Sequence, residues 1–194
     1  MSDSRLTAES CLPGGRVART FKRAGDIQVR IEERFPVFVL EVATFGALQS
    51  RDIEHFEATT GARPPTSGNA LRANNIEVAA LGPNRWTIIA HSELIFTPGD
   101  NFAVTDLGSA RTCFIVSGPK AAIVLAKGTS IDLHPSVFPA GSAAATRISH
   151  FSALIWQLDM EDGFSILTPR SYAQSFYDWL VLAASEFGGE TQAL

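Results

Sequence analysis

The hydrophobic pattern of the chain changes its period several times, and each change marks a different expected element. In the first half, short runs of apolar and β-branched residues have the composition of strands, at residues 27–31, 37–42, 76–81 and 86–90. Pro36 lies between the first two runs and belongs at an edge or a turn. Gly82-Pro83-Asn84-Arg85 joins the last two runs as a hairpin turn, and residues 62–75, rich in Pro, Gly and Asn, predict a loop.

Between these strands the apolar positions take the spacing of a short helix. We expect this helix to span residues 51–60, with Ser50 as its N-cap and with Ile53 and Phe56 on its buried face. Gly61 follows, and it predicts that the helix ends in a left-handed residue.

The second half of the chain repeats this order of elements. Strand-like runs occur again at residues 112–116, 145–151, 153–158 and 164–167. A helix over residues 119–126 follows the first of these runs, with Ser117 as its expected cap and Pro119 in its first turn. Gly128 is expected to form a left-handed exit from this helix, and residues 129–142 form a long loop.

Two segments, LGPNRWTIIA (81–90) and MEDGFSILTP (160–169), share a turn, an aromatic residue and a short β-branched strand. The matched order of elements predicts an α+β fold of two pseudo-equivalent strand-helix-strand-strand lobes with antiparallel sheets. We therefore divide the chain into a flexible basic N-terminal arm (1–25), a first lobe (26–101), a second lobe with the C-terminal helix (102–188) and a tail (189–194). The arm carries five basic residues against two acidic ones, and it is either a functional extension or a tail without a role.

The last helix, expected over residues 171–187, is unusually apolar. At 100° per residue its aromatic and aliphatic side chains cover an arc of about 200°, roughly twice the stripe that a surface helix needs. Leu182 also interrupts the remaining polar side. Such a helix is either buried deep in its own core or covered on a second side by another chain. The candidates for contact with a partner are Tyr172, Phe176, Trp179 and Leu182.

The composition disfavours several classes of protein. Apolar residues make up 45% of the 194 residues and charged residues 19%, which suits a packed core rather than a disordered chain. A net charge of −4 disfavours nucleic acid as a partner, because phosphate binding needs a basic surface. No apolar run has the length of a membrane helix, and the N-terminus lacks the apolar core of a signal peptide. The two cysteines predict no disulfide framework, so a cytoplasmic location is expected.

The sequence contains none of the usual cofactor motifs. It has neither a GxGxxG fingerprint nor a GxxxxGK[ST] loop. Ser117-Gly118-Pro119-Lys120 opens a helix, but proline removes an N–H donor, which favours a plain helix cap over an anion site. None of the four histidines has metal-ligand spacing to another ligand. We therefore expect no catalytic, cofactor-binding or metal-binding residue on this chain.

For the remaining candidate residues a structural role is favoured over a chemical one. Asp132 and His134 alternate along an extended segment, where they form a loop-stabilising pair or, less readily, a catalytic pair. Cys113, in apolar surroundings, is expected to be a buried and unreactive thiol, whereas Cys11 lies in the polar arm. Trp86 is expected to anchor its hairpin on the core rather than to stack on a ligand.

Six segments between residues 81 and 180 carry a family resemblance. They are LGPNRW (81–86), VTDLGSART (104–112), SGPKAAIVLAKG (117–128), IDLHPSVFPAG (131–141), RISH (147–150) and PRSYAQSFYDWL (169–180). Each is weak alone, but together and in this order they resemble the gamma (small) subunit of heterotetrameric sarcosine oxidase. The resemblance runs through most of residues 70–187.

The resemblance implies a non-catalytic subunit of a complex with alpha, beta and delta subunits. Such a complex oxidises the N-methyl group of sarcosine and yields glycine, hydrogen peroxide and a one-carbon unit that passes to tetrahydrofolate. FAD, FMN, NAD and tetrahydrofolate are then held by other subunits, and none by this chain. The resemblance also implies a fold like part of the aminomethyltransferase (glycine cleavage T-protein).

Three alternatives stay open from the sequence. The chain resembles the small subunits of related complexes that oxidise other N-methyl amines, such as N-methylglutamate. It is alternatively a stand-alone, folate-dependent aminomethyltransferase-like protein, for which Asp106 and Asp132 are the candidate carboxylates, or an independent module that binds a small ligand.

Overall fold

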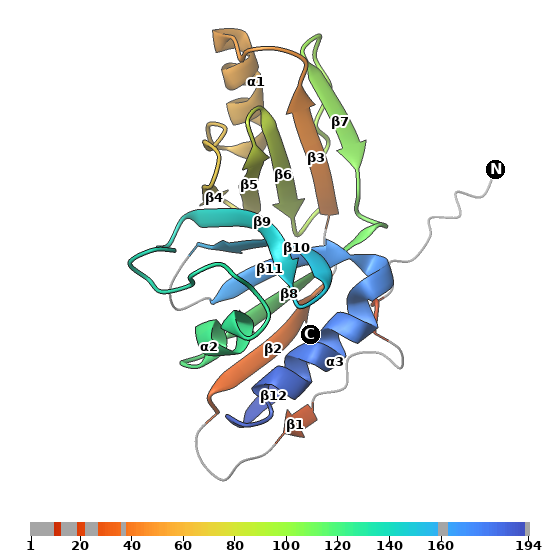
Figure 1. The fold of residues 1–194 in the computed structure, drawn as a ribbon. Helices are drawn as coiled ribbons and strands as arrows, with labels where there is room; N and C mark the ends of the chain where they lie inside the picture. The colour runs from red at the N-terminus through yellow and green to blue at the C-terminus, as the bar shows by residue number, and fades with distance from the viewer. Residues whose placement is uncertain (1–9, 13–18, 22–26, 36–37, 159–162, 193–194) are drawn as a thin grey trace, which may run out of the picture.

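The computed structural model describes residues 10–12, 19–21, 27–35, 38–158 and 163–192. One contiguous stretch of the chain forms a five-stranded antiparallel sheet in the order β4-β5-β6-β3-β7 (Figure 1). Its elements are β3 (Phe38–Thr44), α1 (Ser50–Thr60), β4 (Ala70–Ala73), β5 (Ile76–Gly82), β6 (Arg85–Ala90) and β7 (Phe102–Asp106).

The remaining elements form a seven-stranded sheet in the order β1-β12-β2-β8-β11-β10-β9. They are β1 (Arg19–Phe21), β2 (Val29–Arg34), β8 (Arg111–Ser117), α2 (Ala121–Ala126), β9 (Ser142–Ile148), β10 (Phe151–Gln157), β11 (Phe164–Pro169), the 3₁₀ turn η1 (Arg170–Tyr172), α3 (Ala173–Ala184) and β12 (Gly189–Gln192). The β12–β2 ladder is parallel, whereas the other ladders of this sheet are antiparallel. The α+β class with antiparallel sheets is therefore confirmed.

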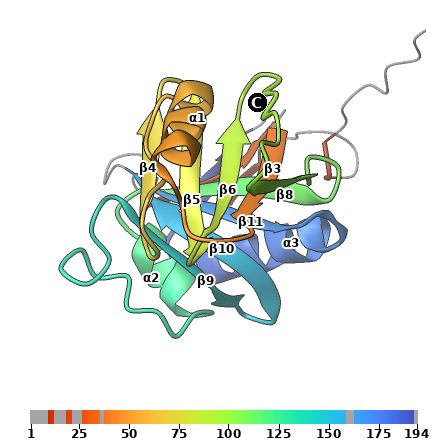
Figure 2. The same ribbon diagram turned by 90° about the horizontal axis from the view of Figure 1, so that it is seen from above.

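Alternating side chains divide the interior into three apolar layers. The layer between the sheets contains Val39 and Ile89 from the smaller sheet and Cys113, Leu154 and Trp156 from the larger one. The outer layer of the smaller sheet lies under α1, and that of the larger sheet lies under α2 and α3. Figures 1 and 2 show the result, with the helices outside and the two sheets between them. The period of two along each strand produces this arrangement, because successive side chains enter different layers.

The first helix closely follows its sequence signals. It ends at Gly61, which has the expected left-handed conformation with φ of 79°, and Phe56 is fully buried. Its N-cap is Gln49 rather than Ser50, because the Asp52 carboxylate accepts a hydrogen bond from the Gln49 backbone N–H at 2.9 Å. This hydrogen bond holds the pKa of Asp52 below its ordinary value.

The two ends of α2 differ from the sequence expectation in their cap and in the role of their glycines. The N-cap is Lys120, not Ser117. Gly118 has φ of +102°, and a Cβ atom there would lie 2.6 Å from the Gln28 carbonyl oxygen. Only glycine therefore fits between α2 and the start of β2. Gly128 was expected to be left-handed, but its φ is not positive. A glycine is required there for another reason, since a Cβ atom would lie 2.5 Å from the Trp179 ring.

Strand membership crosses the lobe division expected after residue 101. β2 pairs with β8 in the larger sheet, whereas β7 pairs with β3 in the smaller one. Four strands also lie where none was expected. β1 falls inside the predicted arm, β4 inside the predicted loop 62–75 and β12 inside the predicted tail, and β7 forms between the predicted strands of the two lobes. The expected turns at Pro36 and at residues 160–162 lie outside the described residues.

The described parts of the N-terminal arm are packed on the larger sheet. The Cys11 backbone N–H donates to the Glu33 carboxylate at 3.1 Å, and the Ser10 hydroxyl donates to the same carboxylate. Leu12 and Cys11 contact the core under α3, and β1 pairs with β12. These residues of the arm are therefore held by hydrogen bonds to the buried Glu33 side chain, which also accepts one from the Thr112 hydroxyl at 3.3 Å.

Candidate partner-binding surface

The wide apolar arc of α3 is covered mainly by its own chain. Phe176 and Leu180 have no solvent exposure, and Phe176 packs edge-on against Phe114 and Phe151 with ring centroids 5.6 and 5.4 Å away. The choice of Phe176 as a partner contact is therefore corrected: its side chain lies in the core. The width of the arc reflects packing against both the larger sheet and α2.

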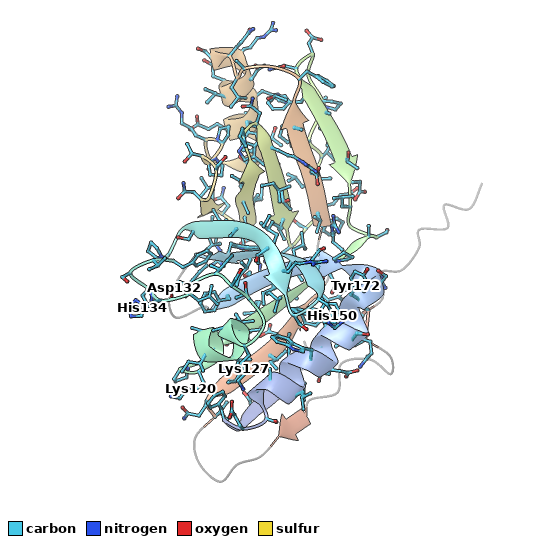
Figure 3. All side chains as sticks on the ribbon, viewed as in Figure 1. Lys120, Lys127, Asp132, His134, His150 and Tyr172 are labelled. Carbon is cyan, nitrogen blue, oxygen red and sulfur yellow. The ribbon has the colours of Figure 1, made fainter. Side chains whose placement is uncertain are left out.

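The segment after α2 holds α3 in place on its second side. Trp179 stacks on Phe176 at a centroid distance of 6.1 Å and reaches the backbone of Gly128. The Lys127 ammonium group donates to the Ala183 carbonyl and to the Glu186 carboxylate, and it lies 4.7 Å from the centroid of the Phe187 ring. A cation at the C-terminus of a helix is favourable because the last carbonyls carry partial negative charge. Figure 3 shows Lys127 between α2 and the end of α3.

Three of the four candidate contact residues lie at the surface. Leu182 is 72% exposed and Tyr172 46% exposed, while Trp179 is partly buried. At 100° per residue their side chains fall within about 80° of one another around the helix. We call this group the α3 strip. His150, at the tip of the β9–β10 hairpin, lies close to Tyr172 (Figure 3).

A buried charge cluster joins the two sheets. The Glu77 carboxylate of β5 accepts from the Arg34 guanidinium of β2 at 2.7 Å and from the Trp156 indole N–H of β10 at 2.7 Å. Arg72 of β4 donates to the same carboxylate at 2.9 Å. The side chains of Glu77 and Arg34 are only 2% and 8% exposed. This arrangement satisfies a carboxylate in an apolar layer and therefore has a structural rather than a catalytic geometry.

Asp132 and His134 stabilise their own loop. The Asp132 carboxylate accepts from the His134 backbone N–H at 2.9 Å, and His134 Nδ1 lies 2.8 Å from the Ser136 hydroxyl. Both side chains are exposed, and both point away from α3 in Figure 3. The geometry therefore supports a loop-stabilising role for Asp132 and His134.

We expect Asp132→Ala and His134→Ala to lower the free energy of unfolding by about 1 kcal/mol each, the usual loss for one hydrogen bond. Urea unfolding measures this change, and turnover of a complex containing the variant should stay within a few-fold of wild type. A hundredfold loss of turnover with an unchanged melting temperature would assign these residues to chemistry instead.

The two cysteines differ in burial. Cys113 has no exposure, and burial raises the pKa of its thiol to about 12. Cys11 is half-buried beside Glu33, and burial raises the pKa of its thiol. Cys113 is thus the buried thiol that the sequence predicts, whereas Cys11 does not lie in a free tail.

We expect Ellman's reagent at pH 8 to leave Cys113 unmodified in the folded chain, because the thiolate is the reactive form. Cys11 should react, but more slowly than in the urea-unfolded chain. A Cys11→Ser variant isolates the signal of Cys113, and rapid labelling of this variant under native conditions would contradict the burial of β8.

The other sequence candidates also have structural partners. Trp86 packs against Phe56 at a centroid distance of 5.4 Å and donates its indole N–H to the Pro65 carbonyl, as expected for a hairpin anchor. His55 lies 2.7 Å from the Thr97 carbonyl oxygen through Nε2, and Ser149 bonds to His150 Nδ1 at 3.0 Å. Within the described residues, no three His, Cys, Asp or Glu side chains are grouped so that they could hold a metal ion.

Two further places have features that an anion site needs, a helix start and a pair of arginines, but neither is a built anion site. At the start of α2 the Lys120 backbone N–H already donates to the Gln28 carbonyl at 3.1 Å and the Ala121 N–H to the Gly118 carbonyl at 3.0 Å, so these two donors are not available to an anion. A cleft of about 470 Å³ lies between the sheets and is lined by Glu41, Arg111 and Arg147, among other residues. Neither arginine forms an ion pair with a described residue. The cleft lacks the glycine-rich turn at a helix N-terminus that a dinucleotide requires.

Comparison with known proteins places this geometry in a family. Residues 71–186, more than half of the chain, match the family described as sarcosine oxidase, gamma subunit family. The chain belongs to this family. The resemblance drawn from the six sequence segments is thereby confirmed.

Curated relatives of the gamma subunit family agree. The chain is 34% identical over 120 residues to the sarcosine oxidase subunit gamma of Corynebacterium sp. (strain P-1), covering 58% of this chain and 59% of that one. It is 31% identical over 128 residues to the Arthrobacter sp. subunit, covering 62% and 63%. The matched regions thus span about three fifths of these two relatives.

Two solved structures share the fold. A chain of the heterotetrameric sarcosine oxidase from Corynebacterium sp. U-96, in complex with pyrrole 2-carboxylate, superposes with a TM-score of 0.74 at 26% identity, covering 84% of this chain and 87% of that chain. The aminomethyltransferase T of the Bartonella henselae glycine cleavage system superposes with a TM-score of 0.56 at 16% identity, covering 82% and 49%. The second likeness confirms the expected aminomethyltransferase-like fold and nothing further.

Sequence reasoning missed the buried charge cluster of this gamma-family chain. Arg34 and Glu77 are 43 positions apart, and each reads as a surface charge in its own strand. The one available signal was that both residues lie in strand-like runs whose alternate side chains point toward the core.

None of the helices in the described part of the chain has the length and apolar character to span a bilayer.

Proposed function

We propose that this chain is the non-catalytic gamma subunit of a heterotetrameric sarcosine oxidase-type complex. The observation that carries the proposal is its likeness to a chain of the solved heterotetrameric sarcosine oxidase, over 84% of this chain and 87% of that one. At 26% identity and a TM-score of 0.74, this likeness extends across both sheets rather than one motif.

In this proposal the complex contains alpha, beta and delta subunits, and it converts sarcosine to glycine with reduction of oxygen to hydrogen peroxide. The one-carbon unit passes to tetrahydrofolate. FAD, FMN, NAD and tetrahydrofolate lie on the other subunits. The site geometry supports this division, because the candidate side chains on this chain are engaged in packing, loop hydrogen bonds or ion pairs.

The α3 strip supplies a surface for one partner subunit. Leu182 on α3 and Tyr172 just before it carry large, exposed side chains, and α3 is held in place by Gly128 and Lys127. Because the helix is fixed before assembly, binding a partner there needs little reordering. We propose that Tyr172, Trp179 and Leu182 contact the partner, without Phe176.

A stand-alone aminomethyltransferase has less support. Asp106 accepts a hydrogen bond from the Gly108 backbone N–H at 2.8 Å, and Asp132 accepts one from His134. Both candidate carboxylates are therefore exposed and stabilise turns, and Asp106 borders an open hollow, whereas a one-carbon site needs a carboxylate inside a pocket that encloses the substrate.

The test is co-expression of this chain with the alpha, beta and delta subunits from the same source, with an affinity tag on a large subunit. We expect the chain to co-purify in stoichiometric amount and the complex to form peroxide when sarcosine is added. N-methylglutamate, supplied in parallel, distinguishes the related amine-oxidising complexes. Absence of the chain from the purified complex, with full activity remaining, would refute the proposal.

A further inference from the structure

The outer edge of the smaller sheet is open at β7. β7 is the last strand in the order of that sheet, and no described strand pairs with its other side. The Leu107 backbone N–H donates to the Val39 carbonyl, and the Phe45 N–H donates to the Asn101 carbonyl. Because hydrogen-bonded pairs alternate along an antiparallel ladder, Val104 lies at a position whose N–H faces away from β3. The edge therefore presents backbone donors and acceptors to another strand.

A hollow of about 320 Å³, lined by both apolar and acidic residues, lies beside this edge. The segment that joins β6 to β7 crosses the outer face of the sheet and forms one wall, while the ends of β3 and β7 form the rest. The lining residues are Phe38, Leu40, Glu93, Leu94, Ile95, Phe96, Val104 and Asp106. Ile95 is 77% exposed and Phe38 38% exposed, although both are large apolar residues. We call this feature the β7 hollow. Its volume is enough to hold one or two side chains of another chain.

The charged residues of the β7 hollow are both acidic. Glu93 and Asp106 are exposed, and Glu93 forms no ion pair with a described residue. From the described residues, Asp106 accepts one hydrogen bond, the local one from the Gly108 backbone N–H to Oδ1. A second copy of this chain, paired edge to edge, would place like charges together and is therefore disfavoured. A basic partner is complementary to this rim.

We propose that an extended segment of a partner subunit adds to the open edge of β7 and inserts an apolar side chain into the β7 hollow, with Lys or Arg residues facing Glu93 and Asp106. Strand addition derives affinity from backbone hydrogen bonds and specificity from alternate side chains in pockets. The inference rests on the proposed role as a subunit, and it assigns a second contact surface on the smaller sheet, distinct from the α3 strip on the larger one.

Three variants test the three components of this contact in the co-expressed complex. Ile95→Asp places a charge in the hollow, Glu93→Lys reverses the rim, and Val104→Pro removes the outward N–H. Val104→Ala is the control for the loss of the side chain alone. Affinity of each purified variant for the tagged complex lacking this chain is measured by biolayer interferometry, alongside its melting temperature.

We expect Ile95→Asp and Glu93→Lys each to weaken binding at least tenfold without lowering the melting temperature. Val104→Pro should weaken binding more than Val104→Ala, because only the proline removes the N–H that would bond to the added strand. The proline variant should still fold, because this N–H forms no hydrogen bond with β3 and proline is tolerated at a sheet edge. Glu54→Lys, on exposed α1, makes the same charge change away from the hollow and should leave binding unchanged, as should Ile123→Asp on α2.

The outcomes separate this inference from the proposed function. If wild type binds and the hollow variants bind equally well, or if the controls lose binding to the same extent, the β7 contact is refuted while the subunit role stands. If wild type does not bind at all, the subunit role itself is refuted. Should Val104→Pro fail to fold, the Ile95 and Glu93 variants still decide the question.

Discussion

Replacement of Glu77 by Gln is expected to lower the free energy of unfolding by about 3–5 kcal/mol, the cost of removing one partner of a buried ion pair. The Arg34 guanidinium would then remain between the two sheets at 8% exposure without its counter-charge. The glutamine amide keeps one acceptor oxygen, so its NH2 group would face either the Trp156 indole N–H or the two guanidinium groups. The loss therefore reports both the missing charge and one missing acceptor. Equilibrium urea denaturation, followed by tryptophan fluorescence and by circular dichroism, measures the change.

The matched control for this variant is Glu57→Gln. Glu57 pairs with Arg63 at 3.5 Å, and the two side chains are 51% and 76% exposed. Exposed pairs contribute about 0–1 kcal/mol, so this variant should barely change stability. If Glu77→Gln also changed the free energy of unfolding by less than 1 kcal/mol, the charge cluster would not be a principal connection between the sheets.

Leu182→Asp is expected to abolish assembly while leaving the isolated chain intact. Leu182 is 72% exposed in the free chain, so the substitution should change the free energy of unfolding by about 0.5 kcal/mol or less. In the proposed complex the same carboxylate would be buried without a partner and would weaken association by several kcal/mol. Co-purification with tagged large subunits and the melting temperature of the free variant are measured together.

Gln174→Glu provides the control for charge on α3. Gln174 lies in the first turn of the helix, where a negative charge suits the helix dipole, and its side-chain amide donates to the Asp178 carboxylate at 2.8 Å. It is about 80° around the axis from Leu182 and further from Tyr172 and Trp179. Its assembly should be normal. Normal assembly of Leu182→Asp as well would remove Leu182 from the interface, and a large loss of its melting temperature would show that the side chain supports the core of its own chain.

Local signals in the sequence were sufficient where one residue type fixes one conformation. Gly61 ends α1 because few other residues adopt its left-handed backbone, and Asn84, with φ of 56°, completes the predicted turn between β5 and β6. The strands with β-branched runs, such as β6 and β8, were found for the same reason. These features depend on neighbours in the sequence alone.

Features that depend on distant neighbours were not visible in the sequence. β12 has the polar sequence GETQ, and it becomes a strand because β2 and β1 supply partners on both sides. β7 ends in Thr105 and Asp106, which read as a polar lead-in to the next strand. Gly128 carried a signal for a helix end, but its actual requirement is the close approach of Trp179 from 51 positions later in the chain.

The interface candidates show the same limit. An apolar arc of about 200° on a helix indicates that two sides are covered, but periodicity does not say by which chain. The structure covers Phe176 with Phe114 and Phe151, both from strands of its own sheet. Leu182, which interrupts the polar side of the predicted helix, is the most exposed of the four candidates.

The strands of the smaller sheet lie in the sequence between β2 and β8 of the larger sheet, and this arrangement sets an order for folding during synthesis. The five-stranded sheet is built from residues 38–106 without interruption, so all of its strands are available while the rest of the chain is still being translated. β2 emerges before that sheet, yet its neighbours β8 and β12 come after it. Because domains fold as their strands emerge from the ribosome, β2 must wait unpaired until β8 arrives, and its β12 edge is closed only when residues 189–192 are made.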